Sequence, residues 1–80
     1  MSVNEAVKER ILELCRQNQI SLNKLCINSG VTQSTLNNFV SGRNRSITLS
    51  TLKKLCDGLD ISITAFFTSP MFEDLEQEVI

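Results

Sequence analysis

One local pattern occurs four times in this chain: an apolar residue, a serine or threonine, three variable residues, and a second apolar residue. The hydroxyl of each copy can accept hydrogen bonds from the free backbone N–H groups of a first helical turn. The two apolar residues can close over that turn as a hydrophobic staple. Four helix starts within 80 residues leave room only for short helices. The copies are Ile20-Ser21…Leu25, Val31-Thr32…Leu36, Ile47-Thr48…Leu52 and Ile61-Ser62…Phe66.

A longer helix is predicted before these copies, because apolar residues follow the i, i+4, i+7, i+8 spacing of one buried face. Gly30 and Gly42 supply the left-handed backbone that ends a helix. The alternating pattern at 61–64 is better explained by a helix cap and staple than by a strand. The sequence therefore predicts an all-α fold. The expected helices are 3–17, 22–29, 33–41, 49–59 and 63–68.

The inward faces of these helices define the expected core. Gly58, inside the helix expected at 49–59, is expected to be a weak spot of about 1 kcal/mol relative to alanine. The residues expected to be buried are Val7, Ile11, Leu14, Cys15, Leu25, Cys26, Leu36, Phe39, Val40, Leu52, Leu55, Cys56 and Leu59, with Leu22 as a possible addition.

The chain is short enough for one domain, which we expect at residues 1–69, followed by an acidic C-terminal tail at 70–80. Pro70 ends the last predicted helix, and Glu73, Asp74, Glu76 and Glu78 follow it. Two interpretations of the tail remain open. It is either a frayed or surface-docked terminal segment, or a contact in a dimer or with a partner.

Composition excludes several classes of function. No run of about 18 apolar residues is present, and the first twenty residues lack an export signal, so we expect a cytoplasmic protein without a membrane segment. The chain has no histidine and no phosphate-binding loop, which argues against an enzyme. The spacing of Cys15, Cys26 and Cys56 matches no metal or redox motif, so we expect reduced, buried thiols and neither a metal nor a cofactor.

Positive charge is gathered in one part of the chain. Between Cys15 and Cys56 there are six basic residues and no acidic one, although the net charge is −1. This concentration suits a surface that lies against a phosphate backbone. The basic residues are Arg16, Lys24, Arg43, Arg45, Lys53 and Lys54.

The helix expected at 33–41 has an unusual outer face. With its apolar residues turned inward, the outward side chains are all amides and hydroxyls: Gln33, Ser34, Asn37, Asn38 and Ser41. A solvated helix face more usually carries Glu and Lys, which are better helix formers. Glutamine and asparagine can both donate to N7 and accept from N6 of adenine, and serine can contact several bases. We therefore expect a DNA-reading helix; the alternative is a set of ordinary surface polar groups.

Polar and basic residues on either side of this helix are candidates for phosphate contacts. Arg43, Asn44 and Arg45 form a basic loop directly after it, and arginine there can clamp phosphates or reach into a minor groove, positioning the protein without specifying sequence. Ser21 and Asn23, at the start of the preceding helix, can present a hydroxyl, an amide and free N–H groups to another phosphate.

The segment Ser21–Gly42, with Ile47–Leu52 and Leu59–Phe66 downstream, resembles the helix-turn-helix of the lambda-repressor-like (Cro-type, XRE) family. The resemblance covers about residues 5–68. It implies a compact five-helix bundle whose third helix enters the major groove, usually as a homodimer on a palindromic operator. By position, it implies base contacts from Gln33, Ser34, Asn37 and Asn38. It implies backbone contacts from Ser21, Asn23, Thr32, Thr35, Ser41, Arg43, Asn44 and Arg45.

Two positions and the composition of one segment depart from the family pattern. Leu22 stands where the family often has a glutamine that touches the DNA backbone, and Cys26 replaces the usual alanine at the helix crossing. The segment 33–41 contains no Arg or Lys, the commonest readers of guanine, so we expect A·T pairs to be read.

The sequence thus predicts a transcriptional regulator of the repressor type that binds double-stranded operator DNA as a homodimer, with no small-molecule ligand. The alternative is a protein-interaction module, or an antitoxin-like regulator under a partner's control, built on the same fold.

Overall fold

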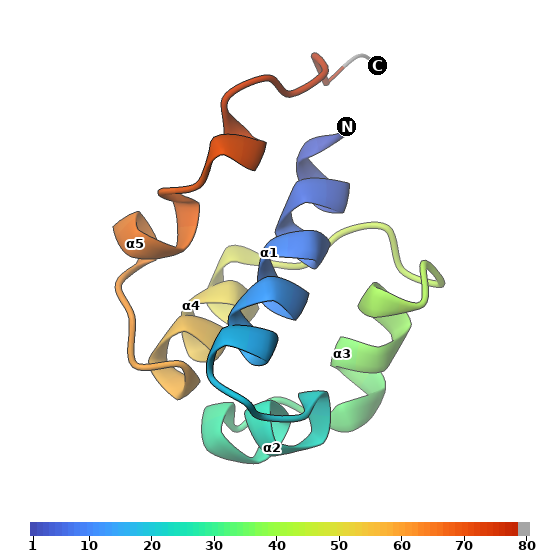
Figure 1. The fold of residues 1–80 in the computed structure, drawn as a ribbon. Coiled ribbons are helices and arrows are strands. Elements are labelled where there is room, and N and C mark those ends of the chain that lie inside the picture. Colours follow the sequence, from blue (N-terminus) through green and yellow to red (C-terminus); the bar gives the residue numbers. More distant parts are fainter. Residues whose placement is uncertain (79–80) are drawn as a thin grey trace.

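The computed structural model describes residues 1–78 as an all-helical bundle (Figure 1). The elements are α1 (Val3–Gln17), α2 (Leu22–Ser29), α3 (Gln33–Val40), α4 (Leu49–Gly58), α5 (Ile63–Phe67) and a short 3₁₀ turn, η1 (Pro70–Phe72). The five predicted α-helices are confirmed. Within the described residues there is no strand, and no helix is both long and apolar enough to cross a membrane.

The predicted helix starts are confirmed by their capping bonds. In each of the four copies, the side-chain oxygen of the capping residue accepts from the backbone N–H three residues later, at 2.9 to 3.3 Å. Helix α1 begins with a capping box, which the sequence analysis did not single out: Ser2 and Glu5 exchange backbone-to-side-chain hydrogen bonds, both of 3.1 Å. These local bonds explain why such short segments begin as helices where they do.

Three helices end one residue earlier than predicted. Ser41, Leu59 and Thr68 follow α3, α4 and α5 as C-cap residues instead of closing the helices themselves. This difference of one residue is small. A C-cap residue still donates its N–H to a carbonyl of the last helical turn, but its own carbonyl no longer accepts a helical hydrogen bond.

The core is one cluster to which all five helices contribute. Almost all residues predicted to be buried are buried, and Phe66 of α5 joins them with no exposed surface. Val40 is an exception, since it is only partly buried against the edge of the cluster, as Leu22 is. In Figure 1, α1 runs through the middle of the molecule, α2 lies across one end of it, and α3 and α4 lie on different sides.

Two links between helices form the same turn without a glycine. Gln19 after α1 and Asp60 after α4 have positive φ angles of 56° and 58°. In each link the next residue donates its N–H back to a cysteine carbonyl five residues earlier, Ile20 to Cys15 and Ile61 to Cys56, both at 3.0 Å. This hydrogen bond is characteristic of the Schellman motif. The residue after it, Ser21 or Ser62, is the N-cap of the following helix. The sequence analysis did not predict this motif, because neither position carries the usual glycine.

The C-terminal segment returns to α1. The rings of Phe67 and Phe72 lie edge to face with centroids 4.8 Å apart, and the Glu76 carboxylate is 2.9 Å from the Met1 amine. That carboxylate raises the pKa of the amino group by holding its charged form. Both ends of the described chain therefore lie at the end of the molecule opposite α2 (Figure 1).

Helices α2 and α4 pack closely where Gly58 faces Ser29. A Cβ added at Gly58 would lie 2.0 Å from the Ser29 Oγ, closer than real Cβ atoms approach another atom, and 3.1 Å from the Ser29 Cα, a tight contact. The expectation that Gly58 is only a weak spot was therefore wrong: the missing side chain is what lets the two helices approach.

Replacing Gly58 with alanine is accordingly expected to destabilise the protein by about 1–3 kcal/mol, although alanine is the better helix former. Urea unfolding measures the change. In a Ser29→Gly background, which removes the opposing side chain, the same substitution is expected to cost much less. An equal loss in both backgrounds would contradict the contact.

Candidate nucleic-acid interface

A tight turn sets α3 at a fixed angle to α2. Gly30 ends α2 in the left-handed conformation, with φ of 69°, and Val31 donates its N–H to the Cys26 carbonyl at 3.2 Å. The Val31 side chain is 9% exposed, so the turn is fastened to the core by an apolar residue. Thr32 then caps α3. The two helices and the turn form a helix-turn-helix unit.

Helix α3 separates an apolar side from a polar one. Leu36 and Phe39 are buried, at 0% and 4% exposure. On the outer side Gln33, Ser34 and Asn37 are exposed, and Asn38 is half-buried. The structure thus places the four residues predicted to read bases on the outside of one helix, at or next to its exposed face.

Gln33 and Asn23 hydrogen-bond to each other across the turn. The Gln33 Nε2 donates to the Asn23 Oδ1, joining the first residue of α3 to the second residue of α2. The sequence predicts a phosphate contact for Asn23 and gives no sign of this bond. No signal in the sequence could have found it, because it depends on the angle between the two helices.

The predicted backbone-contact residues that cap helices already have local partners. The Ser21 hydroxyl accepts from the Lys24 N–H at 3.0 Å, which leaves its own proton free to be donated. The hydroxyls of Thr32 and Thr35 bond to each other at 2.7 Å. Only one of those two hydroxyls can therefore donate to a phosphate without breaking this bond.

The segment after α3 is shaped by bonds back to the helix. Gly42 has a φ of 86°, and Asn44 donates its N–H to the Asn38 carbonyl at 2.9 Å. The Ser41 hydroxyl donates to the same carbonyl at 3.3 Å. Arg43 and Arg45 are exposed, and within residues 1–78 neither forms a salt bridge.

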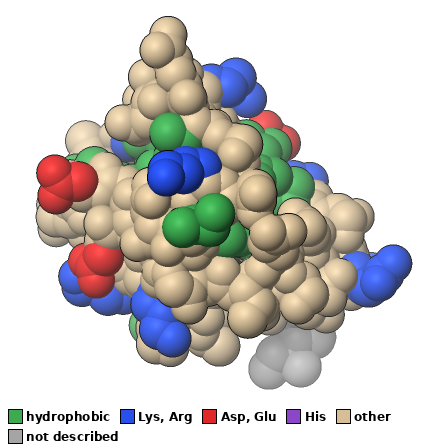
Figure 2. All heavy atoms as spheres, turned by 90° about the horizontal axis from the view of Figure 1, so that it is seen from below, with side chains coloured by type: hydrophobic (Ala, Val, Ile, Leu, Met, Phe, Trp, Pro, Cys, Tyr) green, Lys and Arg blue, Asp and Glu red, His purple; other side chains and the backbone are tan. Residues whose placement is uncertain are grey.

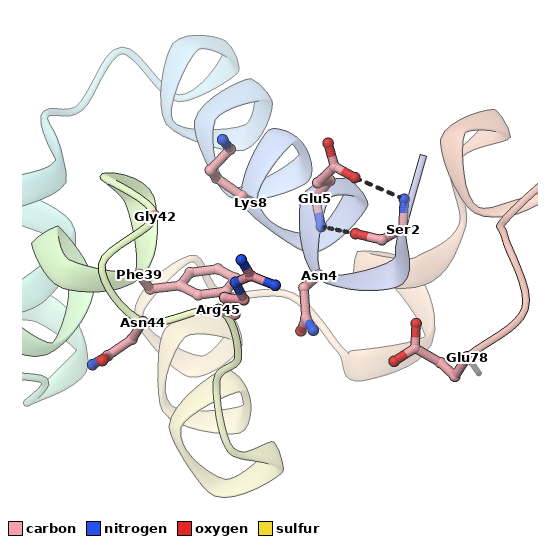
Figure 3. A pocket seen from close by; sticks show the side chains of 9 residues that line it. All are labelled: Ser2, Asn4, Glu5, Lys8, Phe39, Gly42, Asn44, Arg45 and Glu78. Carbon is pink, nitrogen blue, oxygen red and sulfur yellow. Dashed lines mark hydrogen bonds between the residues drawn. The ribbon is translucent and has the colours of Figure 1, made fainter. Parts of the chain in front are cut away.

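Arg45 lies beside a groove between this loop and the start of α1 (Figure 3). The groove has a volume of about 480 Å³ and brings together side chains of both charges. In Figure 3 Arg45 points toward Asn4 of α1, whereas Asn44 points to the opposite side. Of the three loop residues predicted to touch phosphates, Arg45 therefore extends toward α1. The lining residues are Ser2, Asn4, Glu5, Lys8, Phe39, Gly42, Asn44, Arg45 and Glu78.

The end of the molecule formed by α2 is shown in Figure 2. Uncharged polar side chains and backbone cover most of this face, with Lys and Arg side chains scattered over it and a small hydrophobic patch at its centre. Two apolar side chains that the sequence analysis left out are strongly exposed, Ile27 on α2 (66%) and Leu49 at the start of α4 (76%).

The three cysteines are free and buried. Burial raises the pKa of all three thiols, because the charged thiolate is poorly solvated there. Such thiols act as small apolar core residues and are poor nucleophiles. Within residues 1–78 no three side chains suited to hold a metal ion lie together.

Comparison with known proteins identifies the class to which this fold and surface belong. The family model of the Cro/C1-type helix-turn-helix DNA-binding domain matches residues 10–68, most of the chain. The chain therefore belongs to this family of DNA-binding regulators.

A solved structure supports the same assignment. The chain is similar to the prophage Lp1 protein 11, whose crystal structure superposes with a TM-score of 0.81 at 33% sequence identity. The match covers 94% of this chain and 100% of that one. No curated protein matches the chain.

Substitutions of Thr32 test whether its capping hydrogen bond stabilises α3. Replacing Thr32 with alanine removes the acceptor of the Thr35 N–H and is expected to cost about 1 kcal/mol of stability. Replacing Thr32 with serine keeps the acceptor and is expected to cost clearly less. Urea unfolding measures both, with Thr48→Ala, which removes the same cap from α4, as the matched control. A Thr32→Ala protein as stable as the original would show that this cap does not hold α3.

Proposed function

We propose that this protein is a sequence-specific transcriptional repressor that occupies double-stranded operator DNA with α3 in the major groove. The observation that supports the proposal most strongly is the outer side of α3, which carries only amides and hydroxyls beside a loop with two exposed arginines that form no salt bridge within residues 1–78. Such a surface makes hydrogen bonds to base edges while the flanking charges hold the phosphates.

The dimensions of α3 suit this role. Its eight residues, at about 1.5 Å each, give a rod about 12 Å long, comparable to the width of the major groove. Gln33 and Asn37 each offer one donor and one acceptor side by side, the pattern that adenine requires. The absence of Arg and Lys from α3 favours a site read through A·T pairs.

Phosphate contacts are proposed from both sides of α3. Ser21 offers a hydroxyl proton at the start of α2, and Arg43 offers an exposed guanidinium after α3. Arginine binds phosphate oxygens through two parallel N–H groups, so it fixes the position of the protein on the duplex. Because Arg45 extends toward α1, Arg43 is the loop residue we expect to contribute most.

We further propose that two copies bind together. One helix of this length contacts only a few base pairs, and helix-turn-helix proteins usually gain specificity by placing two recognition helices about 34–36 Å apart on a two-fold site. The protein acts in the cytoplasm of a prokaryotic host or of a phage-infected cell. Selecting bound duplexes from a random pool would give the operator sequence and, from the half-site spacing, the dimer geometry.

DNA affinity is expected to fall steeply with salt. With roughly four to eight phosphate contacts per dimer, the binding constant should drop about 10²- to 10⁴-fold between 50 and 200 mM salt. Fluorescence anisotropy of a labelled duplex measures it. An absence of binding to any duplex at low salt would overturn the proposal and favour a protein-interaction module.

Base readout and phosphate binding are expected to separate in two variants. Gln33→Ala should lose about 1–3 kcal/mol of discrimination between the selected duplex and single-base-pair variants of it. Arg43→Ala should weaken binding to all these duplexes alike and, because it removes one phosphate contact from each of two copies, reduce the salt slope by about 2. If the two variants behaved in the same way, the proposed division between α3 and the loop would be wrong.

A further inference from the structure

We infer that the C-terminal segment 73–78 is autoinhibitory. It places the carboxylate of Glu78 in the groove between α1 and the loop after α3, where this carboxylate competes with DNA phosphates for Arg45. The inference rests on the proposed function and adds a regulation of the same surface. It gives the acidic tail, for which the sequence leaves two interpretations open, a role within its own chain.

The segment is fastened to the rest of the molecule on both sides of its first acidic residues. Phe72 packs against the core cluster, and its ring lies edge to face with that of Phe67. Further along, Glu76 contacts Met1 twice. Its backbone N–H donates to the Met1 carbonyl at 3.1 Å, and its carboxylate lies 2.9 Å from the Met1 amine. Glu78 therefore follows closely after a point that is fixed beside the start of α1.

Glu78 lines the same groove as Arg45. Arg45 reaches the groove from the loop after α3, and Glu78 reaches it from the tail. In Figure 3 Asn4 of α1 lies between these two side chains, and the Glu78 carboxylate points toward the groove. Side chains that lie far apart in the sequence thus bring opposite charges to one groove.

The other charges of the groove favour a carboxylate at this place. Arg45 is exposed and forms no salt bridge within residues 1–78, so its charge can act on a nearby anion. Lys8 adds a second positive charge on the wall formed by α1. Glu5 also lines the groove, but its carboxylate accepts from the Ser2 N–H in the capping box. Of the two acids, Glu78 is therefore the one that can respond to Arg45.

The groove adjoins the surface proposed for DNA. Arg43 and Arg45 belong to the same short loop, so a DNA backbone bound by Arg43 passes close to Arg45. Duplex DNA carries one negative charge per about 1.7 Å of its axis, so it repels a carboxylate held beside this loop. DNA must then displace Glu78 before Arg45 can bind a phosphate. The tail accordingly lowers the affinity for every duplex and leaves the preference between duplexes unchanged.

The size of this effect is moderate, because the two charges act on each other through water. Salt screens such an attraction over a Debye length of about 10 Å at 0.1 M. We expect Glu78→Gln to raise the affinity for the selected duplex about two- to fourfold per copy at about 50 mM salt. The gain is expected to vanish above about 0.5 M salt, where the charges are screened.

Fluorescence anisotropy of labelled duplexes with matched variants tests the inference. Glu73→Gln is the control, because it changes the net charge equally in the same tail, while Glu73 lines a separate surface pocket with Phe67 and Thr68. Glu78→Gln is expected to bind the selected duplex and an unrelated duplex more tightly by the same factor, and Glu73→Gln to change little. Equal gains in the two variants would overturn the inference, since the net charge alone would explain them.

The dependence on Arg45 gives a second test. In an Arg45→Gln background, Glu78→Gln is expected to change the affinity little, because the group for which it competes is gone. An undiminished gain in that background would overturn the inference. If the original protein and all variants bound no duplex at low salt, the proposed function would fail. If the original protein bound DNA and Glu78→Gln bound it no more tightly, the proposed function would stand and this inference alone would be wrong.

Discussion

Helix α3 is too short to be stable on its own, and its dependence on the rest of the molecule is the main constraint on this structure. An isolated eight-residue segment in water is not a stable helix, and this one has no charged pairs to support it. Its stability comes from burying Leu36 and Phe39, each contributing about 1.5–3 kcal/mol relative to exposure, and from the Thr32 cap. Because the inner side supplies the stability, the outer side is free to carry side chains chosen for binding rather than for helix formation.

The orientation of that outer side depends on contacts outside the helix-turn-helix unit. Helix α2 rests on α4 where Gly58 leaves room for Ser29, so the angle of α2 is set by a glycine of a different helix. The turn at Gly30 and Val31 transmits that angle to α3. The Arg10 side chain of α1 holds α5 by donating to the carbonyls of Ala65 and Phe66. The stabilising contacts of α5 and the tail thus lie away from the end formed by α2.

Features set by chemistry within a few residues could be predicted from the sequence. The caps at Ser21, Thr32, Thr48 and Ser62 depend on a hydroxyl at one end of a single turn, and the buried face of each helix follows from its spacing. The outward placement of Gln33 and Asn37 follows directly from the burial of Leu36 and Phe39.

Features set by the approach of two elements could not be predicted. From the sequence alone, Gly58 is only a residue with low helix propensity. The reason for a glycine at this position is the close approach of Ser29 on α2, which the sequence does not show. Asn23 read alone is a polar residue near a helix start, and nothing in the sequence shows that Gln33 reaches it. The direction of Arg45 toward α1 likewise depends on where the loop turns after Gly42. Base and phosphate contacts by particular residues remain proposals.

The central claim is that DNA meets the outer side of α3 together with the start of α2 and the loop after α3. An NMR titration of the isotope-labelled protein with the selected duplex tests it most directly, since each backbone amide reports its own surroundings. The account predicts large shifts within 21–24, 32–38 and 41–45, and small ones in α5 and η1. Shifts concentrated in α5, η1 and the tail, with α3 unchanged, would contradict it.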